Sequence, residues 1–232
     1  MGYPENMGQD SPEYEPPKPN PHREFLVRRN RENIQKVLSG ELTQQQLAEM
    51  QADREVELEN RADHDGLTGL LNYQGFMDAL TEDLGIIHQY DLPAYLGFLD
   101  GDKLKDINDN LGKPTGNKVI QTYAKVLTQI TTRRSHLASL IGRWGGDEFM
   151  ILVIGAGRDE AIEIFEEIRQ DVPKSIKETL NMPDLESTVS IGVVKVGRSD
   201  NAATLTQSAN DNLDRAKEAR NKVVFEPYSP GK

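Results

Sequence analysis

Two pairs of closely spaced carboxylates are the residues best suited to chemistry. Asp100 and Asp102 flank a glycine at the end of an apolar run, and Asp147 and Glu148 follow the glycine pair at 145–146. Alternation along a strand places Asp100 and Asp102 on one face, where like charges repel unless a cation or solvent screens them. Four converging acidic groups would suit Mg2+, whose oxygen ligands leave positions open for triphosphate oxygens. Either pair alone is equally consistent with ordinary solvated carboxylates.

Four apolar runs predict the strands that would position these carboxylates. They cover residues 94–100, 137–143, 148–154 and 187–196. Only four residues, Trp144 to Asp147, separate the two middle runs, which indicates a hairpin. In a sheet of this order, we expect the end of the first strand to lie beside that hairpin.

Four amphipathic patterns predict helices between these strands. They lie at about residues 73–89, 116–131, 160–180 and 204–219. The order helix, strand, helix, hairpin, helix and strand is typical of an α+β fold. We therefore expect a central antiparallel sheet of the polymerase-palm or ferredoxin-like kind, with its helices on one face.

The N-terminal part differs in composition from the rest. Residues 1–22 contain six prolines and predict a tail that does not pack. Residues 23–62 carry apolar side chains at helical spacing and predict a helical segment. Because Arg54 interrupts a narrow apolar stripe, two interpretations stay open: a dimerising coiled coil, or a solvated helix beside the domain. Residues 63–228 are the expected catalytic domain.

The overall composition limits the classes of protein that fit. The 232 residues include 38 acidic and 27 basic side chains, and the net charge of −11 argues against nucleic-acid binding through a broad basic surface. Cysteine is absent, so disulfides and thiolate metal sites are excluded and a reducing compartment is favoured. No apolar run approaches the roughly 18 residues of a membrane helix. We expect a soluble cytoplasmic protein that does not insert into a membrane.

Five short blocks of sequence resemble the successive signatures of GGDEF domains, the diguanylate cyclase family. The blocks are Asp65–Asn72, Asp100–Asp109, Arg143–Phe149, Ser190–Gly192 and Ala216–Lys217. One pentapeptide is a weak signal, but five blocks in matching order and spacing are specific. The resemblance implies a nucleotidyltransferase that condenses two GTP molecules into cyclic di-GMP. In that reaction the 3′-oxygen of one nucleotide attacks the α-phosphate of the other, twice, with release of pyrophosphate.

The resemblance also implies a metal site. Its ligands would be the carboxylates of Asp100 and Asp147 and the main-chain carbonyl of Gly101. Glu148 would be either a further ligand or the base at the 3′-hydroxyl. The expected ion is Mg2+, with Mn2+ as the alternative.

The nucleotide contacts follow from the same resemblance. Main-chain N–H groups from Lys103 through Leu104 to Lys105 would face the phosphates, together with the ammonium groups of Lys105 and Lys217. Asn108 would bond the purine edge. Cyclisation requires two active sites that face each other across two nucleotides, so a homodimer is expected at least during catalysis.

One departure from the family lies at the base-reading position. Where the family has an aspartate that accepts from guanine N1–H and N2–H, this chain has Asn117. An amide offers one acceptor and one donor, which complements adenine, and a wrong edge contact costs about 1–3 kcal/mol. Two outcomes stay open: relaxed specificity that admits ATP or gives a mixed product, or retention of GTP through a shifted side chain or a water.

Two further departures affect the phosphate and product contacts. The family's Ala-Lys-x-x-Gly-Arg-Asn lacks its glycine here, which moves Arg220 by one position, or about 100° around a helix, relative to Lys217. Its phosphate contact is thereby put in doubt. The Arg-x-x-Asp inhibitory site of many cyclases is replaced by His136 and Ser139, so we expect weak product feedback.

Two other functional classes compete with the cyclase. A degenerate GGDEF domain could bind nucleotide and act as a regulator without turnover, although the intact Asp100, Asp147 and Glu148 argue against it. A polymerase that makes linear oligonucleotides is also related in fold, but an acidic protein offers no surface for a template.

Overall fold

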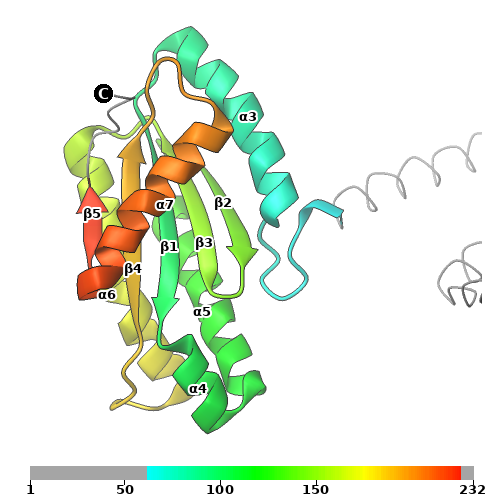
Figure 1. Ribbon diagram of the computed structural model, residues 1–232, viewed down its shortest axis with the longest axis vertical. Coiled ribbons are helices and arrows are strands. Elements are labelled where there is room, and N and C mark those ends of the chain that lie inside the picture. Colours follow the sequence, from blue (N-terminus) through cyan, green and yellow to red (C-terminus); the bar gives the residue numbers. More distant parts are fainter. Residues whose placement is uncertain (1–61, 226–232) are drawn as a thin grey trace, which may run out of the picture. The chain divides into compact units, whose positions relative to one another are not determined.

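The computed structural model describes residues 62–225 (Figure 1). Its strands are β1 (Ala94–Asp102), β2 (Ala138–Gly145), β3 (Glu148–Ile154), β4 (Thr188–Lys195) and β5 (Val223–Phe225). Its helices are α3 (Tyr73–Tyr90), α4 (Leu104–Leu111), α5 (Lys113–Thr132), α6 (Arg158–Leu180) and α7 (Ala202–Ala219). The proline-rich segment predicted for residues 1–22 and the helices predicted up to residue 61 lie outside the described residues.

The strands form one sheet in the order β2-β3-β1-β4-β5. The first four pair antiparallel, as predicted, with β1 at the centre between β3 and β4. β5 was not predicted, because a run of three residues gives no periodic signal; it pairs parallel with β4. The α+β class of the fold is confirmed.

Helices cover both faces of the sheet, which corrects the expectation of helices on one face. In Figure 1, α7 lies in front of β1 and β4, while α5 and α6 lie behind the sheet. Within β1, Leu99 belongs to the core cluster with α5 and α6, whereas Phe98 belongs to the cluster with α3 and α7. A strand whose successive residues are apolar has no polar face to leave in solvent. Both faces therefore require a cover.

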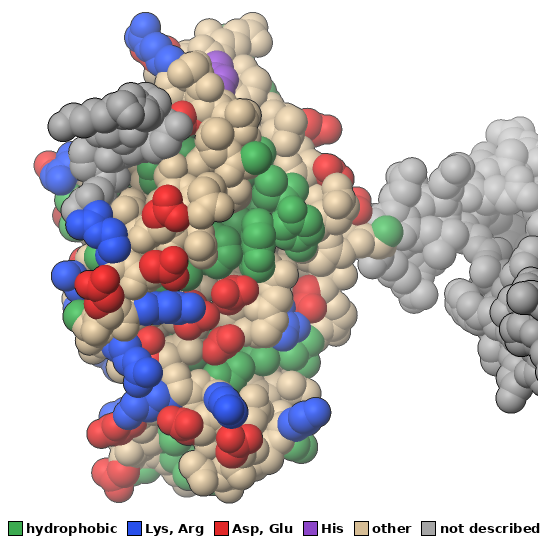
Figure 2. Space-filling view, viewed as in Figure 1, with side chains coloured by type: hydrophobic (Ala, Val, Ile, Leu, Met, Phe, Trp, Pro, Cys, Tyr) green, Lys and Arg blue, Asp and Glu red, His purple; other side chains and the backbone are tan. Residues whose placement is uncertain are grey.

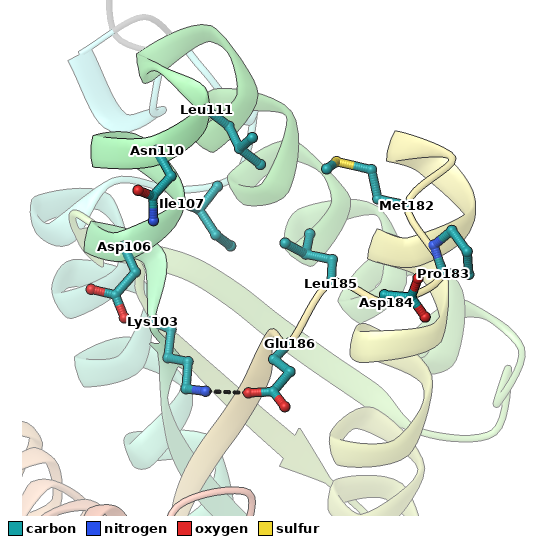
Figure 3. A pocket seen from close by; sticks show the side chains of 10 residues that line it. All are labelled: Lys103, Asp106, Ile107, Asn110, Leu111, Met182, Pro183, Asp184, Leu185 and Glu186. Atoms are coloured by element: carbon teal, nitrogen blue, oxygen red, sulfur yellow. Dashed lines mark hydrogen bonds and ion pairs between the residues drawn. The ribbon is translucent and has the colours of Figure 1, made fainter.

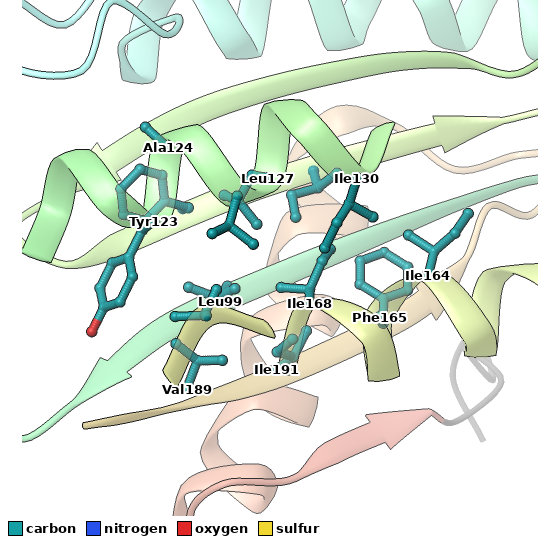
Figure 4. Packing of buried hydrophobic residues seen from close by; sticks show 14 of the residues in the cluster. Leu99, Tyr123, Ala124, Leu127, Ile130, Ile164, Phe165, Ile168, Val189 and Ile191 are labelled. Carbon is teal, nitrogen blue, oxygen red and sulfur yellow. The ribbon is translucent and has the colours of Figure 1, made fainter. Parts of the chain in front are cut away.

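The core behind the sheet fixes α5 and α6 against the strands. Tyr123 and Leu127 of α5 and Phe165 of α6 belong to the same buried cluster as the sheet residues Leu99 and Ile191 (Figure 4). All five side chains are fully buried, and burying a residue of this size stabilises the fold by about 1.5–3 kcal/mol. This packing sets the position of α5, whose N-terminal end carries Asn117.

α7 lies very close to β4 on the opposite face. A Cβ at Gly192 would come within 2.1 Å of the Leu213 nitrogen, so only a glycine permits this approach. The amide of Asn212 donates to the carbonyl of Val193 at 2.8 Å. These contacts fix the middle of α7 on the sheet.

Candidate active site

An ion pair between two of the sequence blocks shapes the turn of the β2–β3 hairpin. Arg143 lies 2.9 Å from Asp65 and donates two hydrogen bonds to the carbonyl of Gly146, at 2.7 and 3.0 Å. Asp65 also accepts from the backbone and hydroxyl of Thr68. Burial raises the pKa of Asp65, but the bonds from Thr68 and the charge of Arg143 outweigh it and lower that pKa below its usual value. Asp65 therefore has a structural role, because it links the turn at Thr68 to the β2–β3 hairpin.

The neighbouring turn leads into α3. Gly69 has a φ of +73°, a conformation that is costly for other residues. Asn72 has a φ of −79°, and its side chain accepts from the Gly75 N–H as the N-cap of α3. Trp144 packs edge-on against Tyr73 and Phe98.

Strand register brings three carboxylates together. Asp100 of β1 lies opposite Glu148 of β3, and the N–H of Gly101 donates to the carbonyl of Asp147 at 3.2 Å. Burial, followed by the charges of Asp100 and Glu148, raises the pKa of Asp147 to about 6. Burial is also the main cause of the raised pKa of Glu148. Repulsion of this kind indicates a site built to receive positive charge.

Lys217 supplies positive charge in the structure as it stands. Its Nζ lies 2.9 Å from Oδ2 of Asp100. Burial alone would lower the pKa of Lys217, but Asp100, Glu148 and Asp147 together raise it. The ammonium therefore stays charged at neutral pH, beside the predicted metal ligands.

The oxygen ligands of this site fit a metal ion that is also coordinated by the nucleotide. Within residues 62–225, no three His, Cys, Asp or Glu side chains are arranged to bind an ion by themselves. Mg2+ is commonly bound by one or two carboxylates together with substrate phosphates, rather than by a complete protein cage. Asp100, Asp147 and the carbonyl of Gly101 suit that arrangement. Gly101 is held over Tyr123, whose hydroxyl would lie 2.5 Å from any added Cβ.

The N-terminal end of α4 offers main-chain donors. Lys103 precedes the helix with a left-handed φ of 70° and no side-chain cap. The N–H groups that open a helix lack partners within it and attract anions; here they include those of Leu104 and Lys105. The side chain of Lys103 points elsewhere and pairs with Glu186 at 2.5 Å. Sequence reasoning missed Glu186, since nothing in its spacing links it to Lys103.

The two asparagines that are predicted to contact the base differ in their surroundings. Asn108 of α4 is half-buried and lies against Gly116, where a Cβ would come within 2.0 Å of its Oδ1. Asn117 is exposed in the first turns of α5. The segment that forms α4 was not predicted to be helical, and α5 begins three residues earlier than expected. The two helices place both amides at the same end of the domain.

A cavity of about 490 Å3 lies beside α4 (Figure 3). Apolar side chains from α4 and from the loop after α6 point into it, and the Lys103–Glu186 ion pair crosses one end. None of the three clustered carboxylates lines it, and neither does Asn108. The lining residues are Lys103, Asp106, Ile107, Asn110, Leu111, Met182, Pro183, Asp184, Leu185 and Glu186.

Asp102 does not join the carboxylate cluster, so three acidic groups converge and not four. Its side chain is 5% exposed and accepts from the hydroxyls of Thr188 and Ser190 and from the N–H of Asn221. Alternation along the strand placed Asp100 and Asp102 on one face correctly. However, the neighbouring strand β4 provides hydrogen-bond donors for Asp102 alone.

Arg220 lies just beyond α7. It forms the C-cap with a φ of 55°, and its N–H donates to the carbonyl of Ala216. Because α7 ends at Ala219, the predicted rotation of Arg220 by about 100° around a helix does not apply. The Arg220 guanidinium is exposed and makes no hydrogen bond or ion pair with another residue of the described range. Its phosphate contact stays a prediction.

The surface predicted to lack product feedback carries ion pairs. Arg133 and Arg134 both pair with Glu167, at 2.8 and 2.6 Å. His136 lies 2.7 Å from Glu160. Both arginines thus already share one carboxylate partner, which competes with a phosphate for their guanidinium groups.

Known proteins share this fold and these blocks. The family model described as "Diguanylate cyclase, GGDEF domain" matches residues 62–222. Diguanylate cyclase DgcM of Escherichia coli K12 is 35% identical over 173 residues, which are 73% of this chain and 40% of that protein. An uncharacterized membrane protein of Staphylococcus haemolyticus, SH2145, is 30% identical over 172 residues, covering 73% of this chain and 47% of that protein. This chain thus spans less than half the length of these curated relatives.

A solved structure of a GGDEF domain is also similar to this chain. The GGDEF domain of DgcB from Caulobacter crescentus, crystallised with c-di-GMP, is 27% identical with a TM-score of 0.62; the match covers 71% of this chain and 95% of that one. None of the helices described between residues 62 and 225 is long and apolar enough to cross a membrane. Diguanylate cyclases among the relatives agree with the expected nucleotidyltransferase class. By its sequence blocks, its sheet order and the family model that covers most of its length, the chain belongs to the GGDEF domain family.

Proposed function

We propose that this GGDEF domain is a diguanylate cyclase that condenses two GTP molecules into cyclic di-GMP and two pyrophosphates. The observation that carries the proposal is the cluster of Asp100, Asp147 and Glu148, with the ammonium of Lys217 at its edge. Figure 2 shows acidic side chains gathered with basic ones on the face that carries α7. A local cluster of both signs suits a small anionic ligand that arrives with a dication.

The residues divide the work of phosphoryl transfer between them. Asp100, Asp147 and the Gly101 carbonyl would hold Mg2+, or Mn2+ in its place. When bound, the ion neutralises the charge that develops on the attacking and leaving oxygens. Lys217 and the opening N–H groups of α4 orient the phosphates. Glu148 serves either as a further ligand or as the base at the 3′-hydroxyl.

The base specificity depends on two amides. Asn108 contacts the purine edge from α4, and Asn117 occupies the second base-reading position. Because Asn117 is exposed, its amide is free to present either its oxygen or its nitrogen to the base. GTP is the first substrate to test, and ATP or a mixed product is the alternative that this amide favours.

Two copies of the domain are required for each product molecule. Each protomer holds one nucleotide, so a homodimer forms at least during catalysis, and residues 23–62 are the proposed dimerising segment. The domain acts in the cytoplasm, where nucleoside triphosphates are available. No nucleic acid takes part in the reaction.

Product identification tests the proposal. The full chain is incubated with Mg2+ and GTP, ATP or both, pyrophosphate release is followed, and products are identified by mass spectrometry. We expect cyclic di-GMP from GTP, with mixed products if Asn117 relaxes specificity. Chelation of the metal and the Asp147→Asn variant are the controls, and both abolish release. Nucleotide binding without any pyrophosphate would instead favour a regulator.

A further inference from the structure

Two buried carboxylates lie at opposite ends of α7. Asp200, 7% exposed, accepts from the Gly197 N–H at 2.6 Å just before the helix begins. Asp102, 5% exposed, accepts from the Asn221 N–H at 3.1 Å just after the helix ends. Both therefore attach a backbone turn at an end of α7, but only the second end carries a residue of the active site.

The hydrogen bonds of Asp102 use both of its oxygens. Oδ2 accepts from the Thr188 hydroxyl at 2.6 Å and from the Asn221 N–H, while Oδ1 accepts from Ser190 at 3.0 Å. These three donors occupy both carboxylate oxygens and hold the side chain in one orientation. Its oxygens have little capacity left for a metal, although it lies only two residues from Asp100.

The turn that Asp102 holds is strained. Arg220 and Asn221 have consecutive positive φ values of 55° and 44°, which cost free energy in residues other than glycine. Such a turn persists only if its surroundings hold it. Besides Asp102, Arg169 of α6 contributes by donating to Oδ1 of Asn221 at 3.0 Å.

The position of the last turn of α7 follows from these contacts. The middle of the helix is fixed where Leu213 lies against Gly192, and its C-terminal end is fixed through Asn221. Lys217 lies between the two points, with its ammonium 2.9 Å from Asp100. A shift of this turn would move the ammonium away from the carboxylates.

We propose that Asp102 is a positioning residue, which holds the Asn221 N–H and thereby places the Lys217 ammonium at the catalytic cluster. The Ser-Ile-Gly block contributes to the same positioning of α7, because Ser190 donates to Asp102 and Gly192 lets the helix approach the sheet. This role rests on the proposed function in one respect, namely that Lys217 serves the bound nucleotide.

A double-mutant cycle between Asp102 and Lys217 tests the role. Asp102→Ala removes all three acceptor contacts, and a displacement of about 1 Å at a catalytic group costs on the order of 100-fold in rate. We expect Asp102→Ala to lower kcat by about 10- to 100-fold and Lys217→Met by at least as much. The double variant should be no slower than Lys217→Met, within about twofold, because Asp102 acts through Lys217.

Two further variants separate positioning from general stability. Asp200→Ala is the matched control, since it also removes a buried carboxylate that holds a turn at an end of α7. We expect Asp200→Ala to lower the melting temperature but to leave kcat within about twofold of wild type. Any small change in kcat should multiply with the change caused by Lys217→Met, because the two residues act independently. Asp102→Asn should restore most of kcat, because its amide oxygen accepts from Thr188 and Asn221 while its nitrogen donates to Ser190.

Several outcomes would overturn the role. One is that the losses of kcat in Asp102→Ala and Lys217→Met multiply in the double variant. Another is that Asp200→Ala loses as much kcat as Asp102→Ala. A third is that Asp102→Asn has a kcat as low as that of Asp102→Ala. If Asp102→Ala does not fold, Thr188→Val removes one donor to Asp102 without leaving a cavity. We then expect a smaller loss of kcat with the same absence of additivity.

The affinity for a non-hydrolysable GTP analogue, measured by calorimetry, keeps the two proposals apart. If the wild type makes no product, the proposed cyclase function is wrong. The double-mutant cycle of Asp102 and Lys217 can then still be measured, with affinity for the analogue in place of kcat. Asp102 is a positioning residue if its variant weakens the analogue only when Lys217 is present. If Asp102→Ala weakens analogue binding by the same factor in the Lys217→Met background, Asp102 is not a positioning residue for Lys217.

Discussion

The two ends of the proposed nucleotide site are built in different ways. The catalytic end lies on the ladder of β1 and β3, where Asp100 faces Glu148 and neither can shift without breaking strand pairing. The base-reading end lies on two helices, with Asn108 packed against Gly116 and Asn117 exposed. Strand register tolerates no slippage of one residue, whereas an exposed amide can be exchanged at little cost to the fold.

This difference indicates which properties of the domain are fixed and which are adjustable. In the proposed function the carboxylate cluster carries out the reaction, and its geometry is coupled to the core of the sheet. The proposed base contact selects the substrate, and it depends on side chains outside that core. We therefore expect substitutions at the first end to abolish turnover and substitutions at the second to redirect it.

The largest effect is expected at Glu148. In Glu148→Gln a donor replaces one carboxylate oxygen, which removes either a ligand or the base at the 3′-hydroxyl. We expect kcat to fall by at least about 10³-fold, measured as pyrophosphate release, with the melting temperature nearly unchanged. Asp109→Asn, at an exposed position of α4, is the control and should keep full turnover. Activity above a tenth of wild type in Glu148→Gln would place the chemistry elsewhere.

The next largest effect is expected at Asn117. Asn117→Asp restores two acceptors for guanine, so the ratio of GTP to ATP turnover should rise by about 5- to 100-fold, as 1–3 kcal/mol per contact implies. Competition between the two nucleotides, with products separated by mass spectrometry, measures the ratio. An unchanged ratio means that Asn117 does not read the base.

A smaller effect is expected in the stability of the metal-free protein. The pKa of Asp147 is raised to about 6 in the folded state, so between about pH 4 and 6 the folded state binds more protons than the unfolded one. The free energy of unfolding then falls as pH rises through this window. Asp147→Asn removes this loss and should be more stable than wild type at pH 7, by about 1 kcal/mol once solvent screening is allowed for.

Urea unfolding in the presence of a chelator measures this difference. At pH 4 the two proteins should have nearly equal stability, because Asp147 is then protonated in the folded state. A gap between the proteins that is the same at pH 4 and pH 7 would contradict the electrostatic explanation. Addition of Mg2+ with nucleotide should reverse the order, because only the wild type keeps the carboxylate.

The smallest effect is expected at the surface of Arg133 and Arg134. Since Glu167 already pairs with both, cyclic di-GMP should leave the rate nearly unchanged. Calorimetry with the product, on wild type and on Glu167→Gln, tests this, and we expect binding to strengthen only in the variant. Tight binding to wild type that is lost in Arg134→Ala would show a feedback site at this surface.

The sequence by itself determined the family and the strands that carry the carboxylates, and it suggested the proposed reaction. These follow from local signals: the ordered blocks, the two-residue alternation that placed Asp100 and Asp102 on one face, and the short hairpin before Glu148. Side-chain types also showed that Asn117 departs from the family at the proposed base-reading position. Each of these properties depends on residues that are neighbours in the chain.

Only the tertiary structure decided which residues from distant segments contact each carboxylate. Asp100 and Asp102 look alike in sequence, yet Asp100 meets Lys217 from α7, and Asp102 is occupied by Ser190 and Asn221. Helices on both faces likewise follow from packing, because a strand that is apolar throughout does not say which helix covers which face. The two carboxylates therefore differ through partners that are about 90 or 120 residues away in the chain but adjacent in the fold. This difference is the basis for proposing a catalytic role for Asp100 and a positioning role for Asp102.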